Sequence, residues 1–242
     1  MRPRTILFAI LLVTLVVSFA SGQSSPAASA ESIKRGNAKY SKAEYLAALE
    51  EYGRIQPQAG EIYSQALFNI GVCYYELWRT EDAVAMYKKA LAARASSYPK
   101  AFYALGVALE ELERPVEAKE AYRQAVAASP SRESGAAHFR LGLLLASEGE
   151  YEEAANHFTE AITWETSPAG HNNLGVVLAL NGRLHEAERE FEAALKQANG
   201  IFADATNNLK LCRFLLKTSA KDQLASMSLV ATTRVHSKIL SR

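Results

Sequence analysis

The feature that most constrains this chain is a row of glycines at nearly constant spacing. They are Gly36, Gly71, Gly106, Gly142 and Gly175, separated by 35, 35, 36 and 33 residues. Twelve residues after each glycine stands an alanine: Ala48, Ala83, Ala118, Ala154 and Ala187. Four residues further on stands an aromatic residue: Tyr52, Tyr87, Tyr122, Phe158 and Phe191. So many matching columns at one period identify an array of about five repeats over residues 31–200.

Each repeat is expected to contain two helices. Apolar residues fall three or four positions apart, as in Leu141 and Leu145, which is the spacing of one face of a helix. The breaks between the two halves carry residues that start helices, such as Thr80 as an N-cap and Pro115 in a first turn. One helical hairpin cannot bury its own apolar face, so stacked copies must share a core. We therefore predict an all-α solenoid of about five helix-turn-helix repeats with a C-terminal capping helix.

The first 22 residues have the pattern of a secretory signal peptide. Arg2 and Arg4 precede an apolar run from Ile6 to Val17, and small residues follow it. The run is short for a membrane-spanning helix, which needs about 20 apolar residues. We expect export to the periplasm or the medium, with an inner-membrane anchor as the alternative if the segment is not cleaved.

The remaining segments are assigned from composition and from the end of the repeat columns. We predict a linker at 23–30, a capping helix at 201–217, and a mobile or loosely packed tail at 218–242. For the tail, a helix through Leu224, Met227 and Val230 that packs on the array is the alternative.

Charge and cysteine content exclude several classes of function. The 27 Lys and Arg residues nearly balance the 26 Asp and Glu residues, so no basic excess indicates a nucleic-acid partner. The two cysteines, Cys73 and Cys212, do not make a disulfide framework. Because each repeat of a solenoid touches only its neighbours, we interpret both as small core residues.

The sequence contains no recognisable catalytic or metal-binding motif. His138 and His171 occupy equivalent places in two repeats, but no carboxylate or cysteine joins them at metal-ligand spacing. No nucleophile stands in a known motif, and the glycines follow the repeat rather than forming a phosphate-binding loop. We expect no enzyme activity, no metal and no cofactor.

The Leu-Gly, alanine, aromatic and alanine columns, with Pro130 closing the third unit, resemble the tetratricopeptide repeat. The resemblance covers about residues 30–200 and implies that the first helix of each repeat lines a concave groove, where ligands usually lie. The residues it places in a peptide-binding groove are Phe68, Asn69, Tyr75, Lys100, Tyr103, Phe139, Arg140, Asn172 and Asn173.

The aromatic members of this set predict an apolar patch that is open to solvent. The alternative is that helix contacts or the C-terminal tail bury them. If the ring of Phe139 lines an open groove, Phe139→Ala should cost little folding stability.

Two ligand-binding arrangements of the family can be compared with this groove. Asn69, Asn173 and Asn208 partly match an asparagine ladder, in which side-chain amides pair with the backbone of an extended peptide. A clamp for a C-terminal carboxylate is rejected. Ile33 and Ala104 stand where the clamp needs Lys and Arg, although Asn37, Asn69 and Lys100 match its other places.

The function predicted from the sequence is that of an exported, non-enzymatic adaptor. It would bind a peptide segment of another envelope protein in the groove. The alternative is a structural or assembly protein that self-associates through the ends of the array. We expect protein or peptide partners, no nucleic acid, and membrane contact only if the N-terminal segment is uncleaved.

Overall fold

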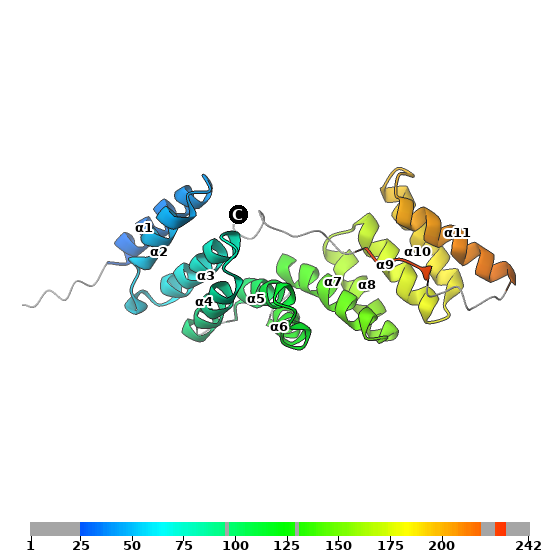
Figure 1. Ribbon diagram of the computed structural model, residues 1–242, viewed down its shortest axis with the longest axis horizontal. Coiled ribbons are helices and arrows are strands. Elements are labelled where there is room, and N and C mark those ends of the chain that lie inside the picture. Colours follow the sequence, from blue (N-terminus) through cyan, green and yellow to red (C-terminus); the bar gives the residue numbers. More distant parts are fainter. Residues whose placement is uncertain (1–24, 95–96, 129–130, 219–225, 231–242) are drawn as a thin grey trace, which may run out of the picture.

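The structure is a computed structural model that describes residues 25–94, 97–128, 131–218 and 226–230. Within these residues the chain forms eleven α-helices and one short 3-10 helix, and no strand, arranged in chain order along an arched array (Figure 1). The elements are α1 (Pro26–Tyr40), α2 (Tyr45–Gly53), η1 (Pro57–Ala59), α3 (Glu61–Glu76), α4 (Thr80–Ala93), α5 (Pro99–Glu111), α6 (Pro115–Ala128), α7 (Arg132–Ser147), α8 (Tyr151–Trp164), α9 (Pro168–Leu180), α10 (Leu184–Gln197) and α11 (Ala203–Thr218). The predicted signal segment lies outside the described residues.

The helices form five consecutive hairpins, and each hairpin packs on the next. The odd-numbered helices α1 to α9 are the first helices of the repeats, and the even-numbered helices are the second. Helix α11 packs against α9 and α10 and closes the array as the predicted capping helix. The predicted all-α solenoid is therefore confirmed. We call the surface formed by α1, α3, α5, α7, α9 and α11 the groove.

The glycine and aromatic columns meet inside each hairpin. A Cβ atom added at Gly71 would lie 2.6 Å from Cε1 of Tyr87, and one at Gly175 would lie 2.6 Å from Cε1 of Phe191. All five column aromatics are fully buried. Only glycine leaves room for a ring at this distance, so the two columns together fix how closely the helices of a hairpin approach.

The turn inside each hairpin has the same backbone conformation. The residue seven positions after each column glycine is left-handed: Ala43 (φ 58°), Trp78 (61°), Glu113 (56°), Gly149 (84°) and Gly182 (83°). A left-handed residue just past a helix end is a common way to reverse the chain, and glycine adopts it without steric cost. In the fourth and fifth hairpins this residue is a glycine, Gly149 and Gly182.

Two local predictions differ from the structure. Helix α1 begins at Pro26, inside the segment 23–30 that was expected to be a linker, because Ser25 accepts a hydrogen bond from the Ala28 backbone and caps it (3.2 Å). Thr80 is not an N-cap but the first residue of α4. Its hydroxyl donates to Glu111 of the next repeat (3.4 Å), so it serves a contact between repeats.

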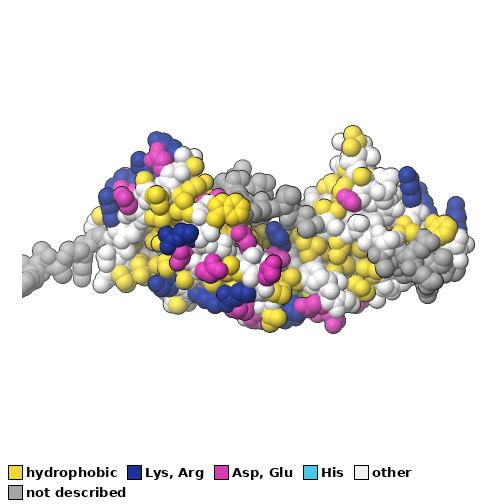
Figure 2. Space-filling model, in the orientation of Figure 1, with side chains coloured by type: hydrophobic (Ala, Val, Ile, Leu, Met, Phe, Trp, Pro, Cys, Tyr) yellow, Lys and Arg dark blue, Asp and Glu magenta, His cyan; other side chains and the backbone are white. Residues whose placement is uncertain are grey.

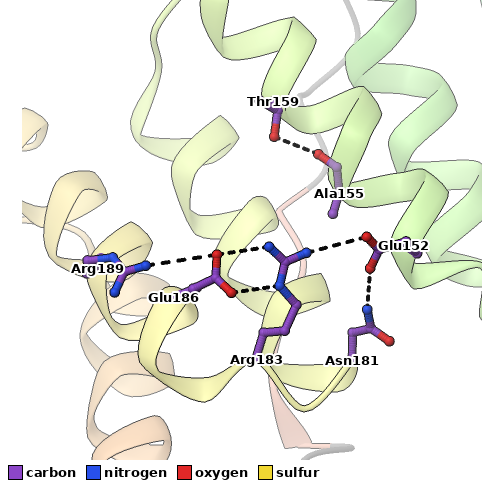
Figure 3. A network of polar contacts seen from close by, with 7 residues as sticks. All are labelled: Glu152, Ala155, Thr159, Asn181, Arg183, Glu186 and Arg189. Atoms are coloured by element: carbon purple, nitrogen blue, oxygen red, sulfur yellow. Dashed lines mark hydrogen bonds and ion pairs between the residues drawn. The ribbon is translucent and has the colours of Figure 1, made fainter.

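Charged side chains connect neighbouring repeats along the second helices. Figure 3 shows Arg183, just before α10, between Glu186 (2.8 Å) and Glu152 of α8 (3.5 Å). Side chains of both signs also line the edge formed by α4 and α6 (Figure 2), where Lys88 pairs with Glu117 (3.6 Å). These pairs are largely exposed, so each contributes at most about 1 kcal/mol.

Cys73 and Cys212 are both buried with free thiols, as expected of small core residues. Burial raises the pKa of Cys73 to about 12 and that of Cys212 to about 11. Among the described helices, none combines the length and the apolar character needed to cross a membrane.

Candidate functional site

Three asparagine side chains lie together at the C-terminal end of the groove. Asn172 and Asn173 project from α9 and Asn208 from α11, and all three are buried. The chain's own residues 226–230 cross them, as the red segment near α9 in Figure 1 shows. Residues 227–230 of the predicted tail are therefore not helical but bound in the groove, whereas 219–225 and 231–242 lie outside the described residues.

The asparagines hold this segment through its backbone. Asn208 accepts a hydrogen bond from the Ser228 N–H (3.2 Å) and donates to the Ser228 carbonyl (3.1 Å), to which Asn172 also donates (3.2 Å). Asn173 accepts from the Val230 N–H (2.8 Å) and donates to the Val230 carbonyl (2.9 Å). Both backbone groups of two alternate residues are therefore paired with side-chain amides, as they would be with a neighbouring strand.

The side chains of the segment alternate between the groove and solvent. Met227 is 9% exposed and belongs to the central hydrophobic core cluster, and Leu229 packs against that cluster. Ser228, between them, is exposed. Figure 2 shows hydrophobic side chains gathered over α7–α9 on this face. The groove thus combines amides for a backbone with apolar surface for every second side chain.

The middle of the groove holds a charged pair. Arg140 of α7 lies 3.5 Å from the carboxylate of Glu110 on α5, and the Tyr122 hydroxyl donates to the same carboxylate. The ring of Tyr103 lies 5.9 Å from that of Tyr122. A side-chain hydrogen bond also joins Tyr103 and Arg140, so two of the predicted groove residues meet here, and Arg140 is already paired with Glu110.

The N-terminal end of the groove contains a cavity of about 480 Å³. Its lining residues are Asn37, Glu61, Ile62, Gln65, Phe68, Asn69, Arg94, Tyr98 and Lys100. Asn69 donates to the side-chain oxygen of Asn37 (3.2 Å), and the Lys100 ammonium lies 5.6 Å from the centre of the Phe68 ring. Burial lowers the pKa of Lys100, against the charge of Glu133. The cavity brings together three predicted site residues and offers amide and ammonium donors.

The predicted aromatic patch is not open to solvent. Phe68 is 1% exposed, Tyr75 is 2% exposed, and Tyr103 and Phe139 are 9% exposed each. Phe139 packs edge-on against Phe158 of α8, with ring centres 5.6 Å apart. The rings of Phe68, Tyr103 and Phe139 each pack against an aromatic ring of the second helix of their own hairpin. The expectation of an exposed Phe139 was therefore wrong, because helix contacts bury the ring. Whether these residues bind a peptide stays a prediction.

Three of the histidines lie in close side-chain pairs. Nδ1 of His138 lies 2.8 Å from Nδ1 of His157, and Nδ1 of His171 lies 2.7 Å from Glu190. Across the described residues, no three His, Cys, Asp or Glu side chains gather as a metal site would require. Burial lowers the pKa of both His138 and His157.

Comparison with known families shows which family the chain belongs to. The family model described as Tetratricopeptide repeat matches residues 79–133, 103–171 and 140–204. These ranges overlap and together span 79–204, which is more than half of the 242 residues. The chain belongs to the tetratricopeptide repeat family. Membership points to an interaction module for other proteins. No curated protein matches the sequence.

Solved structures of other tetratricopeptide proteins share the fold. MamA superposes with a TM-score of 0.59 at 21% identity, over 71% of this chain and 92% of MamA. YrrB, described as a TPR protein with an unusual peptide-binding site, gives 0.55 at 25% identity over 77% and 90%. A tetratricopeptide repeat protein from Parabacteroides merdae ATCC 43184 gives 0.62 at 16% identity over 85% and 82%.

Sequence reasoning missed two parts of the site. Arg94 and Tyr98 line the N-terminal cavity from the connection between α4 and α5, which the repeat columns do not describe. It raised the C-terminal tail only as an alternative that buries the aromatic residues or as a helix packed on the array, and it missed the extended conformation of residues 227–230. A signal for this was available, because Ser226, Met227, Ser228 and Leu229 alternate polar and apolar residues as a strand does.

Proposed function

We propose that this chain is a non-enzymatic adaptor that binds an extended segment of another protein in its groove. One observation carries the proposal: Asn173 and Asn208 pair with both backbone groups of Val230 and Ser228. An amide that donates and accepts at once suits any peptide backbone, whatever its side chains. The description of YrrB as a peptide-binding TPR protein supports the same class of function.

The N-terminal cavity extends the proposed site. It offers Asn37, Asn69 and Lys100 to a ligand that continues along the groove from its C-terminal end. With the signal pattern of residues 1–22, the proposed partner is a protein of the envelope or the medium.

Site-specific photo-crosslinking in cells that make the protein tests this function. A photoreactive residue in place of Gln65, which lines the cavity, should trap a partner. The same residue in place of Lys89, exposed on the second helix α4, is the matched control and should trap none. Adducts at position 89 alone would mean that the partner binds the outer face formed by the second helices.

Self-association through the ends of the array is the second candidate. Ile201 is 88% exposed before α11, and Phe214 on α11 is 44% exposed, so the C-terminal end carries unburied apolar surface. Sedimentation of the purified chain over a range of concentrations tests this role. Self-association would be favoured over the adaptor function if Phe214→Ser abolished the oligomers and the photoreactive residue at position 65 trapped no partner.

A further inference from the structure

Hydrogen bonds also connect the three asparagines at the C-terminal end of the groove to one another. Asn208 donates to the oxygen of Asn172 (3.0 Å), and Asn172 donates to the oxygen of Asn173 (3.3 Å). The remaining amide groups described above serve the backbone of Ser228 and Val230. Buried amides are costly to leave unpaired. The segment that covers these three asparagines also pairs with their amides, so its binding removes them from solvent without leaving them unpaired.

The bound segment shows which kind of peptide the site accepts. Hydrogen bonds fall on residues 228 and 230, and the buried or packed side chains are those of Met227 and Leu229. The main chain is therefore extended, and apolar side chains two residues apart enter the groove. A small polar residue suits the position between them, as Ser228 does, because that side chain faces solvent.

We propose that residues 226–230 are a built-in ligand of the groove. The partner segment is then an extended peptide with apolar residues at alternate positions, and it must displace the chain's own segment to bind. This inference rests on the proposed function and adds the ligand class and its regulation.

Covalent attachment makes the built-in ligand an effective competitor. Residues 219–225, seven in number, connect α11 to the segment. A short tether of this kind gives an effective concentration on the order of 1 mM. A segment with an intrinsic Kd of ~0.1 mM would then occupy the site about 90% of the time and weaken a competing peptide about tenfold.

The first test measures the binding of a probe peptide with the sequence of residues 224–232, capped at both ends and fluorescently labelled. Fluorescence anisotropy should show weak binding to the full chain. The variant Met227→Asp/Leu229→Asp, which weakens the built-in ligand and leaves the groove intact, should bind the probe about tenfold more tightly. Asn173→Ala/Asn208→Ala should lose probe binding. All variants are checked for helix content by circular dichroism.

A control peptide isolates backbone recognition. It carries N-methyl groups on the two nitrogens equivalent to those of Ser228 and Val230, so its side chains are unchanged but the two donors are removed. It should bind the released variant at least tenfold more weakly than the probe. Equal binding of the two peptides would overturn the proposal that the groove recognises the peptide through these two N–H groups.

Amide hydrogen exchange of the unmodified chain provides a test that needs no variant. The N–H groups of Ser228 and Val230 should be protected, and excess probe should remove that protection. Protection that disappears on dilution would mean that a second copy supplies the segment, and it would overturn the assignment to the same chain. Absence of protection would overturn it as well.

The outcome also separates this inference from the adaptor function. If Gln65 crosslinks a partner but the released variant binds the probe no more tightly than the full chain, the adaptor stands and the built-in ligand fails. If Gln65 crosslinks nothing while the probe results hold, the tail occupies the groove and the adaptor function fails.

Discussion

At the scale of single residues, the missing side chain of each column glycine makes the space that the column aromatic ring fills. The five column glycines and the five column aromatics occupy one volume inside each hairpin. A change at either column is therefore a change in the distance between two helices, and its cost follows from how little those helices can move.

Gly106→Ala should lower the free energy of unfolding by about 1–3 kcal/mol, as overpacking does. The added Cβ would lie 2.4 Å from Cε1 of Tyr122. Gly53→Ala, at the end of α2, is the matched control because nothing lies within 4 Å of its Cβ position. It should be neutral or stabilise by up to about 1 kcal/mol. Urea unfolding of both variants measures the difference, and equal effects would refute the packing argument.

Tyr87→Phe should not destabilise the protein. The buried Tyr87 hydroxyl has no hydrogen-bond partner among the described residues, whereas the Tyr52 hydroxyl donates to Asn37 (2.7 Å). Removing an unpaired buried hydroxyl relieves up to about 1–3 kcal/mol, and removing the paired one in Tyr52→Phe should cost about 1 kcal/mol. Thermal unfolding of the two variants side by side would contradict this if Tyr87→Phe melted lower than Tyr52→Phe.

Phe139→Ala should cost about 3–5 kcal/mol, the usual penalty for truncating a core aromatic. The ring is 9% exposed and packs on Phe158, so a cavity would remain. Chemical denaturation measures this loss. A cost under about 1 kcal/mol would restore the original expectation of a ring that lines an open groove.

At the scale of elements, periodicity predicted the helices well and the tail poorly. The three- and four-residue spacing in the repeats has one physical meaning, because each helix must present an apolar stripe to its neighbours. The tail offered two periods at once. Leu224, Met227 and Val230 fit a helix, while Met227 and Leu229 fit a strand. The asparagines of α9 and α11 decided between them, and no local pattern could reveal that contact.

The groove residues show a similar division. Column positions indicated which residues of the first helices face inward, and Asn172, Asn173, Asn69 and Lys100 do line the groove. Exposure did not follow from position, because Phe68 and Tyr75 are large enough to reach the core from the same helix face. Sequence reasoning thus placed the polar part of the site better than the aromatic part.

The contact between α7 and α8 predicts a pH dependence of stability. Burial lowers the pKa of His138 and of His157 below the ordinary 6.5. The carboxylate of Glu160 opposes this shift at both histidines. At His157, Glu153 also opposes the shift and Arg123 adds to it. The unfolded chain therefore binds protons at higher pH than the folded chain. The stability from these neutral histidines is present above about pH 6.5 and is lost as the pH falls below it.

Urea unfolding at pH 7.5, 6.5 and 5.5 checks this dependence. The free energy of unfolding should fall by up to about 1.4 kcal/mol per pH unit for each proton that only the unfolded chain binds. The double variant His138→Gln/His157→Gln should show a shallower fall. The same slope in both proteins would contradict the assignment to this pair.

At the scale of the whole molecule, stability is expected to be distributed repeat by repeat. Among the described helices, the extensive contacts are within a hairpin and with the adjacent hairpin, so these helices connect the two ends of the array through the repeats between them. The capping helix then protects the last hairpin most directly.

Leu215→Ala should lower stability by about 2–4 kcal/mol, since the side chain is almost fully buried in α11. Hydrogen exchange followed by mass spectrometry should show faster exchange in α9–α11 and little change in α1–α4. A matched truncation at Leu46, which is exposed on α2, should change neither region. Equal acceleration in all helices would mean that the array opens as one unit.

The two buried cysteines give the molecule reporters in two separate parts of the array. Cys73 sits in the second repeat and Cys212 in the capping helix, and burial keeps both thiols protonated at neutral pH. A thiol-specific alkylating reagent can therefore reach either one only when its helix opens. The ratio of the two labelling rates, read from peptide masses, compares the opening of the second repeat with that of the capping helix in a single unmodified chain.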